Sequence, residues 1–503
     1  MANYAQKAFR GAGITLIFSV LASLVAYITR VVLARKLTPE EFGLFFAIFN
    51  FVIFFLFFRD LGLPQALVKY IAEFKILQKY NGIKTAIVSV FTFQLLSSAA
   101  FSLFFFLAAE FLAENYFHHP LADPILKFLA VYTILSVLFI VIKSIFQGLQ
   151  LITWYASVEL LKNGIVLGLI LLFLALGRTL FAPVLAYVLV SILLFVIYFP
   201  FVLYGFNFFQ HKLENFKDIT AKLFRFGIPV IATDIGGKVI GYIDTIILTY
   251  YVSLTEVGIY NVVLPSALVF VFLSKAISSV LFPLSTELWT RNKTSTLSHG
   301  LNLIHKYIFI LILPVLVALA VYSKFLIITF FGSEYSSGSL ALQILIVGVG
   351  FYVAASTSIN VISGIGKPKA VTIIILSVAA LNTILNLIFI PLYGINGAAA
   401  TTTLSYLLML IWSTIMAAKY VNSRLPFKEW LLILFPGAGF LGGLLLSQKL
   451  LNLIWPGLTT WIELPISGIF SSIIYFILLQ LFGLLNLKEA KPYFKSILKR
   501  PIK

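Results

Sequence analysis

Five ionisable side chains lie deep within long apolar stretches of the chain: Arg30, Asp234, Lys238, Asp244 and Lys275. A charge in hydrocarbon is costly unless it meets a partner or a water-filled cavity, so such residues mark binding sites or ion pathways. Lysine can hold phosphate as a point charge, and no acidic residue lies one helical turn from Lys275. Lys238 and Lys275 are therefore our candidates for contact with an anionic substrate.

The acidic members of this set allow two interpretations each. Asp234 lies one helical turn from Lys238, so an ion pair within one helix explains both residues without any function. Asp244 has no such local partner, and we predict either a gating ion pair with Arg30 across a central cleft or two separately satisfied residues. Asp234 or Asp244 could also bind a coupling proton or sodium ion, or be purely structural.

Arg59 stands at the end of an apolar stretch, directly before Asp60. It could add to a basic mouth that attracts an anionic substrate. The other interpretation is an ion pair with Asp60 or a contact with a lipid headgroup.

The sequence lacks the residues that several kinds of binding site and catalytic site require. Cysteine is absent, which removes disulfides, thiolate metal sites and cysteine nucleophiles. The run from Gly364 to Pro368 has the wrong spacing for a nucleotide-binding loop. His118 and His119 are neighbours that do not face the same way, so we expect no metal site. With no nucleophile next to a base, we expect no catalytic residue and no cofactor.

Membrane-spanning helices must carry the charges described above. Of the 503 residues, 61% are apolar and 11% are charged, which is too little polar surface for soluble domains. We expect about 14 segments long enough to cross roughly 30 Å of hydrocarbon as helices, in an all-α polytopic membrane protein. They begin near Gly11, Phe42, Thr85, Pro124, Ser157, Leu180, Arg225, Glu256, His305, Ser339, Val371, Asn396, Trp430 and Ile462.

The positive charges indicate how these helices are oriented. Lys and Arg number 36 against 18 Asp and Glu, and most of them fall in connections that we place on one side. Both termini are then cytoplasmic, and the clearest cytoplasmic segments are Lys69 to Lys84, His211 to Arg225 and Lys488 to Lys503. This distribution predicts a multi-pass protein of the cell membrane and gives no reason to expect a nucleic-acid partner.

The chain repeats itself. The run from Glu41 to Phe45 returns as Glu256 to Tyr260, so that Gly43 matches Gly258. Six predicted spans separate the two copies, and an even number gives both copies the same orientation, as in transporters whose lobes rock around a central site. The predicted divisions are a first six-helix lobe (residues 1–220), a second (221–421), and two extra spans with a basic tail (422–503).

Five stretches resemble, in order, the signatures of polysaccharide-biosynthesis flippases: Arg35 to Phe45, Arg59 to Lys69, Tyr242 to Leu248 leading to Glu256 to Tyr260, Gly332 to Tyr335, and Asn386 to Ala399. That family belongs to the multidrug/oligosaccharidyl-lipid/polysaccharide exporter superfamily. The resemblance implies two six-helix lobes that form a V-shaped central cavity, with two extra C-terminal helices.

The resemblance also implies a function. Such a flippase moves an oligosaccharide linked to a polyisoprenyl phosphate from the cytoplasmic to the outer leaflet by alternating access, and it is not an enzyme. Lys238 and Lys275 would hold phosphate while aromatic residues stack on sugars. We expect a monomer in the lipid bilayer that could meet glycosyltransferases or a polymerase of its pathway.

Two other functions stay open at this stage. A cation-coupled multidrug exporter of the same superfamily would place acidic residues in its cavity, and Asp234 and Asp244 fit that description. A membrane scaffold for glycosyltransferases would need neither lysine for transport. A net positive cavity favours the flippase, and a net negative one favours the drug exporter.

Overall fold

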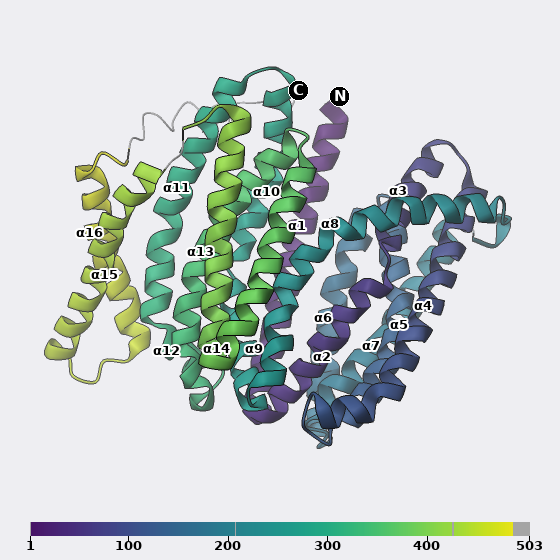
Figure 1. Cartoon of the computed structure of the whole chain (residues 1–503), viewed down its shortest axis with the longest axis horizontal. Helices are drawn as coiled ribbons and strands as arrows, with labels where there is room; N and C mark the ends of the chain where they lie inside the picture. Colours follow the sequence, from purple (N-terminus) through teal and green to yellow (C-terminus); the bar gives the residue numbers. More distant parts are fainter. Residues whose placement is uncertain (1, 207, 425–426, 486–503) are drawn as a thin grey trace. The chain divides into compact units, whose positions relative to one another are not determined.

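The computed structural model describes residues 2–206, 208–424 and 427–485, and within those ranges it is all-helical (Figure 1). The predicted all-α fold is therefore confirmed, while the predicted basic tail from Lys488 to Lys503 lies outside the described residues. The helices are α1 (Ala2–Lys36), α2 (Pro39–Arg59), α3 (Leu63–Ile76), α4 (Tyr80–Asn115), α5 (Ala122–Gly148), α6 (Ile152–Ala175), α7 (Phe181–Phe206), η1 (Phe208–Gln210), α8 (Phe216–Tyr251), α9 (Leu254–Leu268), α10 (Val271–Thr290), α11 (Thr294–Val321), α12 (Ser323–Phe330), η2 (Ser333–Gly338), α13 (Ser339–Gly364), α14 (Pro368–Val421), α15 (Phe427–Ile454) and α16 (Thr460–Leu481).

Eleven helices of the described chain are long and apolar enough to cross a membrane, or up to 12 if the two halves of α8 form one span. The expectation of about 14 spans stays a prediction. The difference lies in two places. α14 counts once although its 54 residues would extend about 80 Å if straight, far more than one bilayer core. The apolar segment that begins near Glu256 is split into the shorter helices α9 and α10.

The chain forms two compact units. We call Phe9–Val262 with Ala379–Ala398 the N-terminal unit, and Val263–Val378 with Ala399–Lys503 and Met1–Ala8 the C-terminal unit. The lobe boundaries expected near residues 220 and 421 stay a prediction.

Long apolar helices make up the N-terminal unit. α5 packs against α4 and α7, α6 packs against α7, and α2 packs against α8. α2 begins where it does because Thr38 and Glu41 form a reciprocal capping box and Pro39 occupies the first turn. The short helix α3 buries one apolar face against α4, α5 and α8, which agrees with an amphipathic piece between spans.

Two long helices change direction at residues that explain the change. α8 bends by 53° between its segments Phe216–Ile231 and Asp234–Tyr251, close to Pro229 (Figure 1). Proline removes a helical hydrogen bond and clashes with the preceding turn. α14 is broken at Gly394, whose φ of 54° is a left-handed conformation that favours glycine.

In the C-terminal unit, α11 packs against α13 and α15, and α15 packs against α16. The core between α11, α15 and α16 includes Ile310, Phe440 and Tyr475. The hydroxyl of Tyr475 donates a hydrogen bond of 2.8 Å to the carbonyl oxygen of Ile310. A phenol buried in this way needs such a partner, so the bond fixes how α16 meets α11.

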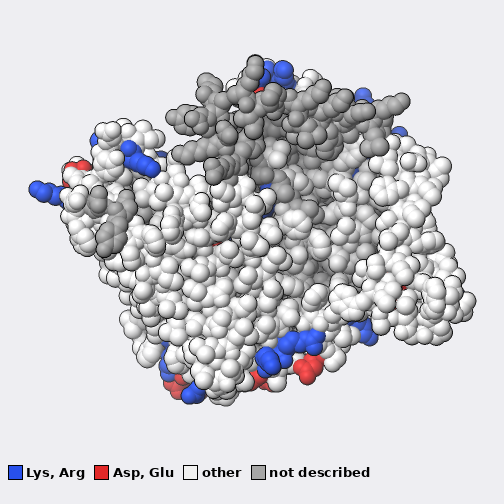
Figure 2. Space-filling model, turned by 180° about the vertical axis from the view of Figure 1, so that it is seen from behind, with Lys and Arg blue, Asp and Glu red and all other residues white. Residues whose placement is uncertain are grey.

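Most of the charged side chains visible in Figure 2 lie along two opposite edges of that face, and few are visible between those edges. This is the surface that a bilayer requires, because hydrocarbon cannot solvate charge. The molecule is a multi-span membrane protein.

Candidate functional site

The two copies of the repeated motif touch through their glycines. A Cβ on Gly43 of α2 would overlap the carbonyl oxygen of Leu254, and one on Gly258 of α9 would overlap that of Pro39. Only a residue without a side chain allows two helices to approach so closely. The motif glycines therefore form a backbone crossing between α2 and α9 inside the N-terminal unit, and we call it the glycine crossing.

Arg30 of α1 lies beside this crossing. Its Nη1 donates a hydrogen bond to the carbonyl oxygen of Asn261 on α9, and its guanidinium carbon lies 4.1 Å from the centroid of the Phe46 ring. The side-chain amide of Asn50 on α2 donates to Oδ1 of Asn261 at 2.8 Å. Asn261 thus ties α1 and α2 to α9 at one point.

Asp244 of α8 is 1% exposed. Its carboxylate accepts hydrogen bonds of 2.6 Å from the hydroxyl of Tyr260 and from the side-chain amide of Asn386. The amide of Asn386 also lies 3.3 Å from Oδ1 of Asn382. Arg30 and Asp244 therefore each have other partners in this structure, and a gating pair between them stays a prediction.

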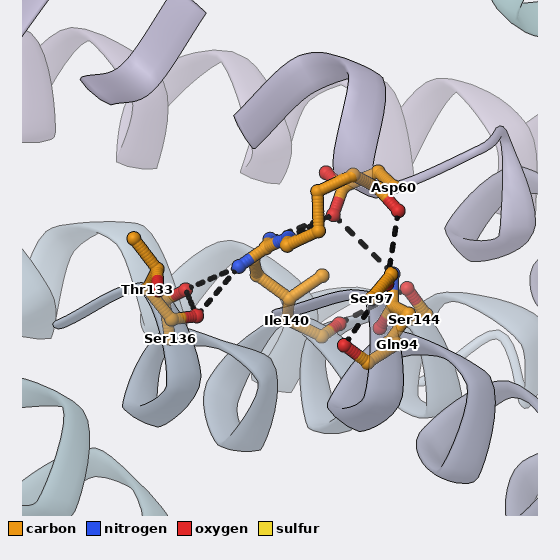
Figure 3. A network of polar contacts seen from close by, with 8 residues as sticks. Asp60, Gln94, Ser97, Thr133, Ser136, Ile140 and Ser144 are labelled. Carbon is orange, nitrogen blue, oxygen red and sulfur yellow. Dashed lines mark hydrogen bonds and ion pairs between the residues drawn. The ribbon is translucent and has the colours of Figure 1, made fainter. Parts of the chain in front are cut away.

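Arg59 ends α2 and is 1% exposed. Its Nε and Nη2 donate to Oδ1 of Asp60 at 2.9 and 2.6 Å, and its Nη1 donates to the carbonyl oxygen of Thr133 and the hydroxyl of Ser136 at 2.8 and 2.7 Å. Figure 3 shows Asp60 at one end of these contacts and Thr133 and Ser136 at the other. The amide of Gln94 reaches Asp60 at 3.4 Å. The ion pair with Asp60 that the sequence allowed is present, and we call the whole set the Arg59 network.

Lys238 lies in the middle of α8 and is exposed. Its ammonium lies 5.9 Å from the ring centroid of Phe57 and 6.0 Å from that of Tyr242. It interacts electrostatically with Asp60 and with Asp234, which is also exposed. The charge of Lys238 therefore acts on both Asp234 and the acid of the Arg59 network.

Lys275 lies on α10 in the C-terminal unit and is exposed. A phosphate site shared by Lys275 and Lys238 stays a prediction.

A second group of charges inside the N-terminal unit was missed by the sequence analysis. Glu159 of α6 forms an ion pair of 2.8 Å with Lys143 of α5 and one of 2.5 Å with Lys162, one turn along its own helix. Lys162 also interacts electrostatically with the phenols of Tyr132 and Tyr187. We call these five residues the α6 cluster.

The two tyrosines of the α6 cluster pack against each other and against a further aromatic ring. The ring of Tyr187 lies 4.5 Å from that of Phe49 and 6.0 Å from that of Tyr132. Tyr187 and Tyr242 both interact electrostatically with Lys162 and with Arg30. Arg30 and Lys162 therefore lie near enough to the same two tyrosines for their charges to act on them.

The signal for the α6 cluster was present in the sequence. Glu159 and Lys162 are three residues apart within an apolar segment, a spacing that places them on one helix face. Lys143 lies in the preceding apolar segment. The tyrosines carried no signal, because aromatic residues are common throughout this chain, with 50 Phe and 23 Tyr.

The fold and the charges inside its spans place the chain in the class of helical membrane transporters. Comparisons with known proteins identify its family within that class. The chain belongs to the polysaccharide biosynthesis protein family, whose sequence model matches residues 8–289. An uncharacterized membrane protein of Methanocaldococcus jannaschii is 28% identical over 99% of this chain and 100% of its own length.

Two further relationships concern flippases. A probable low-salt glycan biosynthesis flippase, Agl15 of Haloferax volcanii, is 26% identical over 43% of this chain and 45% of that protein. The lipid II flippase MurJ in an inward closed conformation shares the fold, with a TM-score of 0.73 over 93% of this chain and 98% of that one at 17% identity. These relationships support a flippase type of transporter and agree with the expectation that the chain is not an enzyme.

Proposed function

We propose that this protein moves a lipid-linked oligosaccharide from one leaflet of the membrane to the other. The substrate has a polyisoprenyl tail, one or two phosphates and a sugar head. The tail stays in lipid, while the charged and polar head crosses along the ionisable residues of the helices. Alternating access of two lobes gives the head a path that avoids hydrocarbon.

The observation that carries this proposal is Lys238. It is an exposed ammonium in the middle of an apolar helix. The ammonium lies 5.9 Å from the ring centroid of Phe57 and 6.0 Å from that of Tyr242. An exposed charge at this depth needs water or an anionic ligand, because the hydrocarbon of the lipid does not solvate a charge. Phosphate is an anion that lysine binds well, and aromatic faces nearby suit the sugar that follows it.

The other basic candidates have different places in this proposal. Lys275 on α10 is a second exposed lysine and belongs to the C-terminal unit. Arg59 is buried and its guanidinium already binds Asp60, Thr133 and Ser136. We therefore assign Arg59 the role of holding Asp60 in place near Lys238, and not that of touching substrate.

The glycine crossing supplies a candidate closure point. Gly43 and Gly258 belong to the two predicted lobes, and their backbones are in contact in this structure. Arg30 and Asn50 add hydrogen bonds to Asn261 beside the crossing. Alternating access would separate these contacts when this end of the pathway opens.

Reconstitution tests the proposal. Full-length protein is placed in liposomes with extracted lipid-linked oligosaccharides, and the accessibility of the sugar heads on the opposite leaflet is measured. We expect transfer by the wild-type protein and a loss of at least about tenfold in Lys238→Ala, because one charge-assisted contact contributes about 1.5–3 kcal/mol. Lys222→Ala removes an exposed lysine from the same helix and should retain transfer. No transfer of any such lipid by the wild-type protein would contradict the proposal.

The same variant separates transport from a scaffolding role. A scaffold for glycosyltransferases works through its surface and should tolerate Lys238→Ala. Loss of export with normal glycosyltransferase assembly in cells carrying Lys238→Ala would exclude scaffolding as the function.

Asp244 favours a second candidate, a cation-coupled drug exporter. A buried carboxylate surrounded by the side chains of Tyr260, Asn386 and Asn382 offers oxygen atoms that a proton or a sodium ion could use. Asp234 is exposed and is the weaker candidate for such a site. Export of ethidium driven by a sodium or proton gradient, lost in Asp244→Asn, would support this candidate. A wild-type protein that moves no dye under either gradient would exclude it.

A further inference from the structure

The α6 cluster has no part in the function proposed above, although its charges lie inside the spans of α5 and α6. Glu159 is shared between Lys143 and Lys162 at 2.8 and 2.5 Å, so one carboxylate faces two ammonium groups. The side chains of Lys143 and Lys162 are 31% and 19% exposed. The cluster therefore carries positive charge that its own acid does not balance, and the protein does not fully enclose its two lysines.

Arg30 increases this excess. Its contacts are the carbonyl oxygen of Asn261 and the face of the Phe46 ring, neither of which carries a negative charge. Tyr187 and Tyr242 interact electrostatically with both Arg30 and Lys162. Within the described part of the chain, Glu159 is thus the one acid paired with the two lysines of the cluster, and Arg30 is paired with none. This excess of positive charge is favourable at this depth only if an anion or water meets it.

The aromatic border of the cluster limits what the anion can be. Tyr187 packs 4.5 Å from Phe49 and 6.0 Å from Tyr132, and both Tyr187 and Phe49 are partly exposed. Aromatic faces offer an apolar surface on which the C–H face of a sugar ring can lie, while phenol groups and the Lys162–Glu159 pair can exchange hydrogen bonds with sugar hydroxyls. The chemistry around the cations is that of a carbohydrate site.

We propose that the α6 cluster and Arg30 form a sugar-binding subsite that selects an acidic sugar, one that carries a carboxylate, in the head of the transported glycan. The carboxylate binds Lys162 and Arg30, whose guanidinium can hold both carboxylate oxygens. Glu159 accepts hydrogen bonds from hydroxyls of the same ring, and Tyr187 supports its face. The inference rests on the proposed function, because it names the class of glycan that the flippase would carry.

The position of Lys238 explains why the anion is assigned to the sugar and not to the lipid phosphate. Tyr242 borders the subsite, and Lys238 lies one turn away on α8, about 6 Å along the helix axis. The ring of Tyr242 lies 6.0 Å from the Lys238 ammonium. Phosphate at Lys238 would thus place the adjoining sugar of the head close to the subsite, since one turn is the scale of one sugar ring.

Binding of two matched disaccharides to the full-length protein in nanodiscs tests the inference. Cellobiuronate carries one carboxylate, and cellobiose is its neutral counterpart. Ligand-observed NMR should show that the wild-type protein binds cellobiuronate about tenfold more tightly, the effect of one charge-assisted contact. Equal binding of the two disaccharides, or binding of neither, would overturn the inference.

Variants of Lys162 tie the preference to the subsite. Lys162→Met keeps a long unbranched side chain and removes its charge, while Lys143 keeps Glu159 paired, so the variant should fold. Its preference for cellobiuronate should fall from about tenfold to about twofold or less, and Lys162→Arg should restore it. Lys222→Met on the exposed surface of α8 is the matched control. An unchanged preference in Lys162→Met, or an equal loss in the control, would contradict the assignment.

Inorganic pyrophosphate distinguishes the two sources of negative charge. We expect Lys238→Ala to weaken pyrophosphate binding and Lys162→Met to leave it unchanged. If pyrophosphate binding instead depends on Lys162 and cellobiuronate does not bind, the subsite holds the lipid phosphate and the inference fails. Failure here is separate from failure of the proposed function, because a protein that flips lipid-linked glycans in liposomes without preference for acidic sugars contradicts only this inference.

Discussion

The Arg59 network and the α6 cluster both hold cations between apolar helices, but they differ in how many partners each cation has. The guanidinium of Arg59 donates to an acid, a carbonyl oxygen and a hydroxyl, so its charge and its donors are satisfied. In the α6 cluster, Lys143 and Lys162 share the one carboxylate of Glu159 and remain partly exposed. A charge in an apolar span therefore does not identify a binding residue by itself, and the partners that it already has decide its role.

The largest effect that can test this comparison is expected for Arg59→Ala. Removal of the guanidinium takes the charged partner from Asp60, which keeps only the 3.4 Å contact from Gln94 among the hydrogen bonds described here. Breaking a buried ion pair in this way costs about 3–5 kcal/mol. We expect a loss of about 3 kcal/mol, because Asp60 is 28% exposed. Thermal unfolding in detergent measures the loss. Arg59→Lys keeps the positive charge but not the planar set of guanidinium donors, and it should lose less stability than Arg59→Ala. Wild-type stability of Arg59→Ala would show that the network is not structural.

A medium effect is expected for Tyr260→Phe. The substitution removes the 2.6 Å hydrogen bond to Asp244 but leaves the one from Asn386. Loss of one bond to a buried carboxylate should lower the free energy of unfolding by about 1.5 kcal/mol. Tyr393→Phe, at an exposed residue of α14, is the control and should not change stability. A neutral Tyr260→Phe would place Asp244 with the unsatisfied charges of the α6 cluster and not with the Arg59 network.

A small effect on stability is expected for Lys162→Met, in contrast to its effect on sugar binding. Lys143 still pairs with Glu159, and the methionine fills the same space in an apolar surrounding. Stability should change by less than about 1 kcal/mol, as measured by the same unfolding assay. A loss as large as that of Arg59→Ala would make the α6 cluster a second structural network and end the comparison.

The smallest effect is expected for Gln94→Leu at the edge of the Arg59 network. The amide of Gln94 reaches Asp60 only at 3.4 Å, and its Oε1 is buried without a hydrogen-bond partner within the described part of the chain. Replacing a poorly satisfied polar group by an apolar one of similar shape is close to neutral, within about 0.5 kcal/mol. A large loss in Gln94→Leu would show that the network extends to α4 and that Asp60 depends on it.

Much of the fold could be predicted from the sequence, because apolar length determines where membrane helices form. Expected starts near Gly11, Phe42, Thr85 and Pro124 fall within or next to the beginnings of α1, α2, α4 and α5. The break between α9 and α10 could not be predicted from length, since the apolar run continues across it.

The candidate site could be predicted only where neighbours in sequence are also partners in space. Arg59 and Asp60 are adjacent, and their ion pair was one of the interpretations of the sequence. Thr133 and Ser136 complete the network but lie far from Arg59 in the sequence, so no spacing pattern indicated this contact. The gating pair of Arg30 and Asp244 was inferred from equivalent repeat positions alone, which do not show which way a side chain points.

The hydrogen bond between Asn50 and Asn261 offers a practical consequence. The two amides are 2.8 Å apart and connect α2 to α9 beside the glycine crossing, and the sequence contains no cysteine that would compete for a thiol reagent. Asn50→Cys with Asn261→Cys would place two labels at this point without background. Spin-label distances measured there, with and without a bound glycan lipid, would report how far the two helices separate during a cycle.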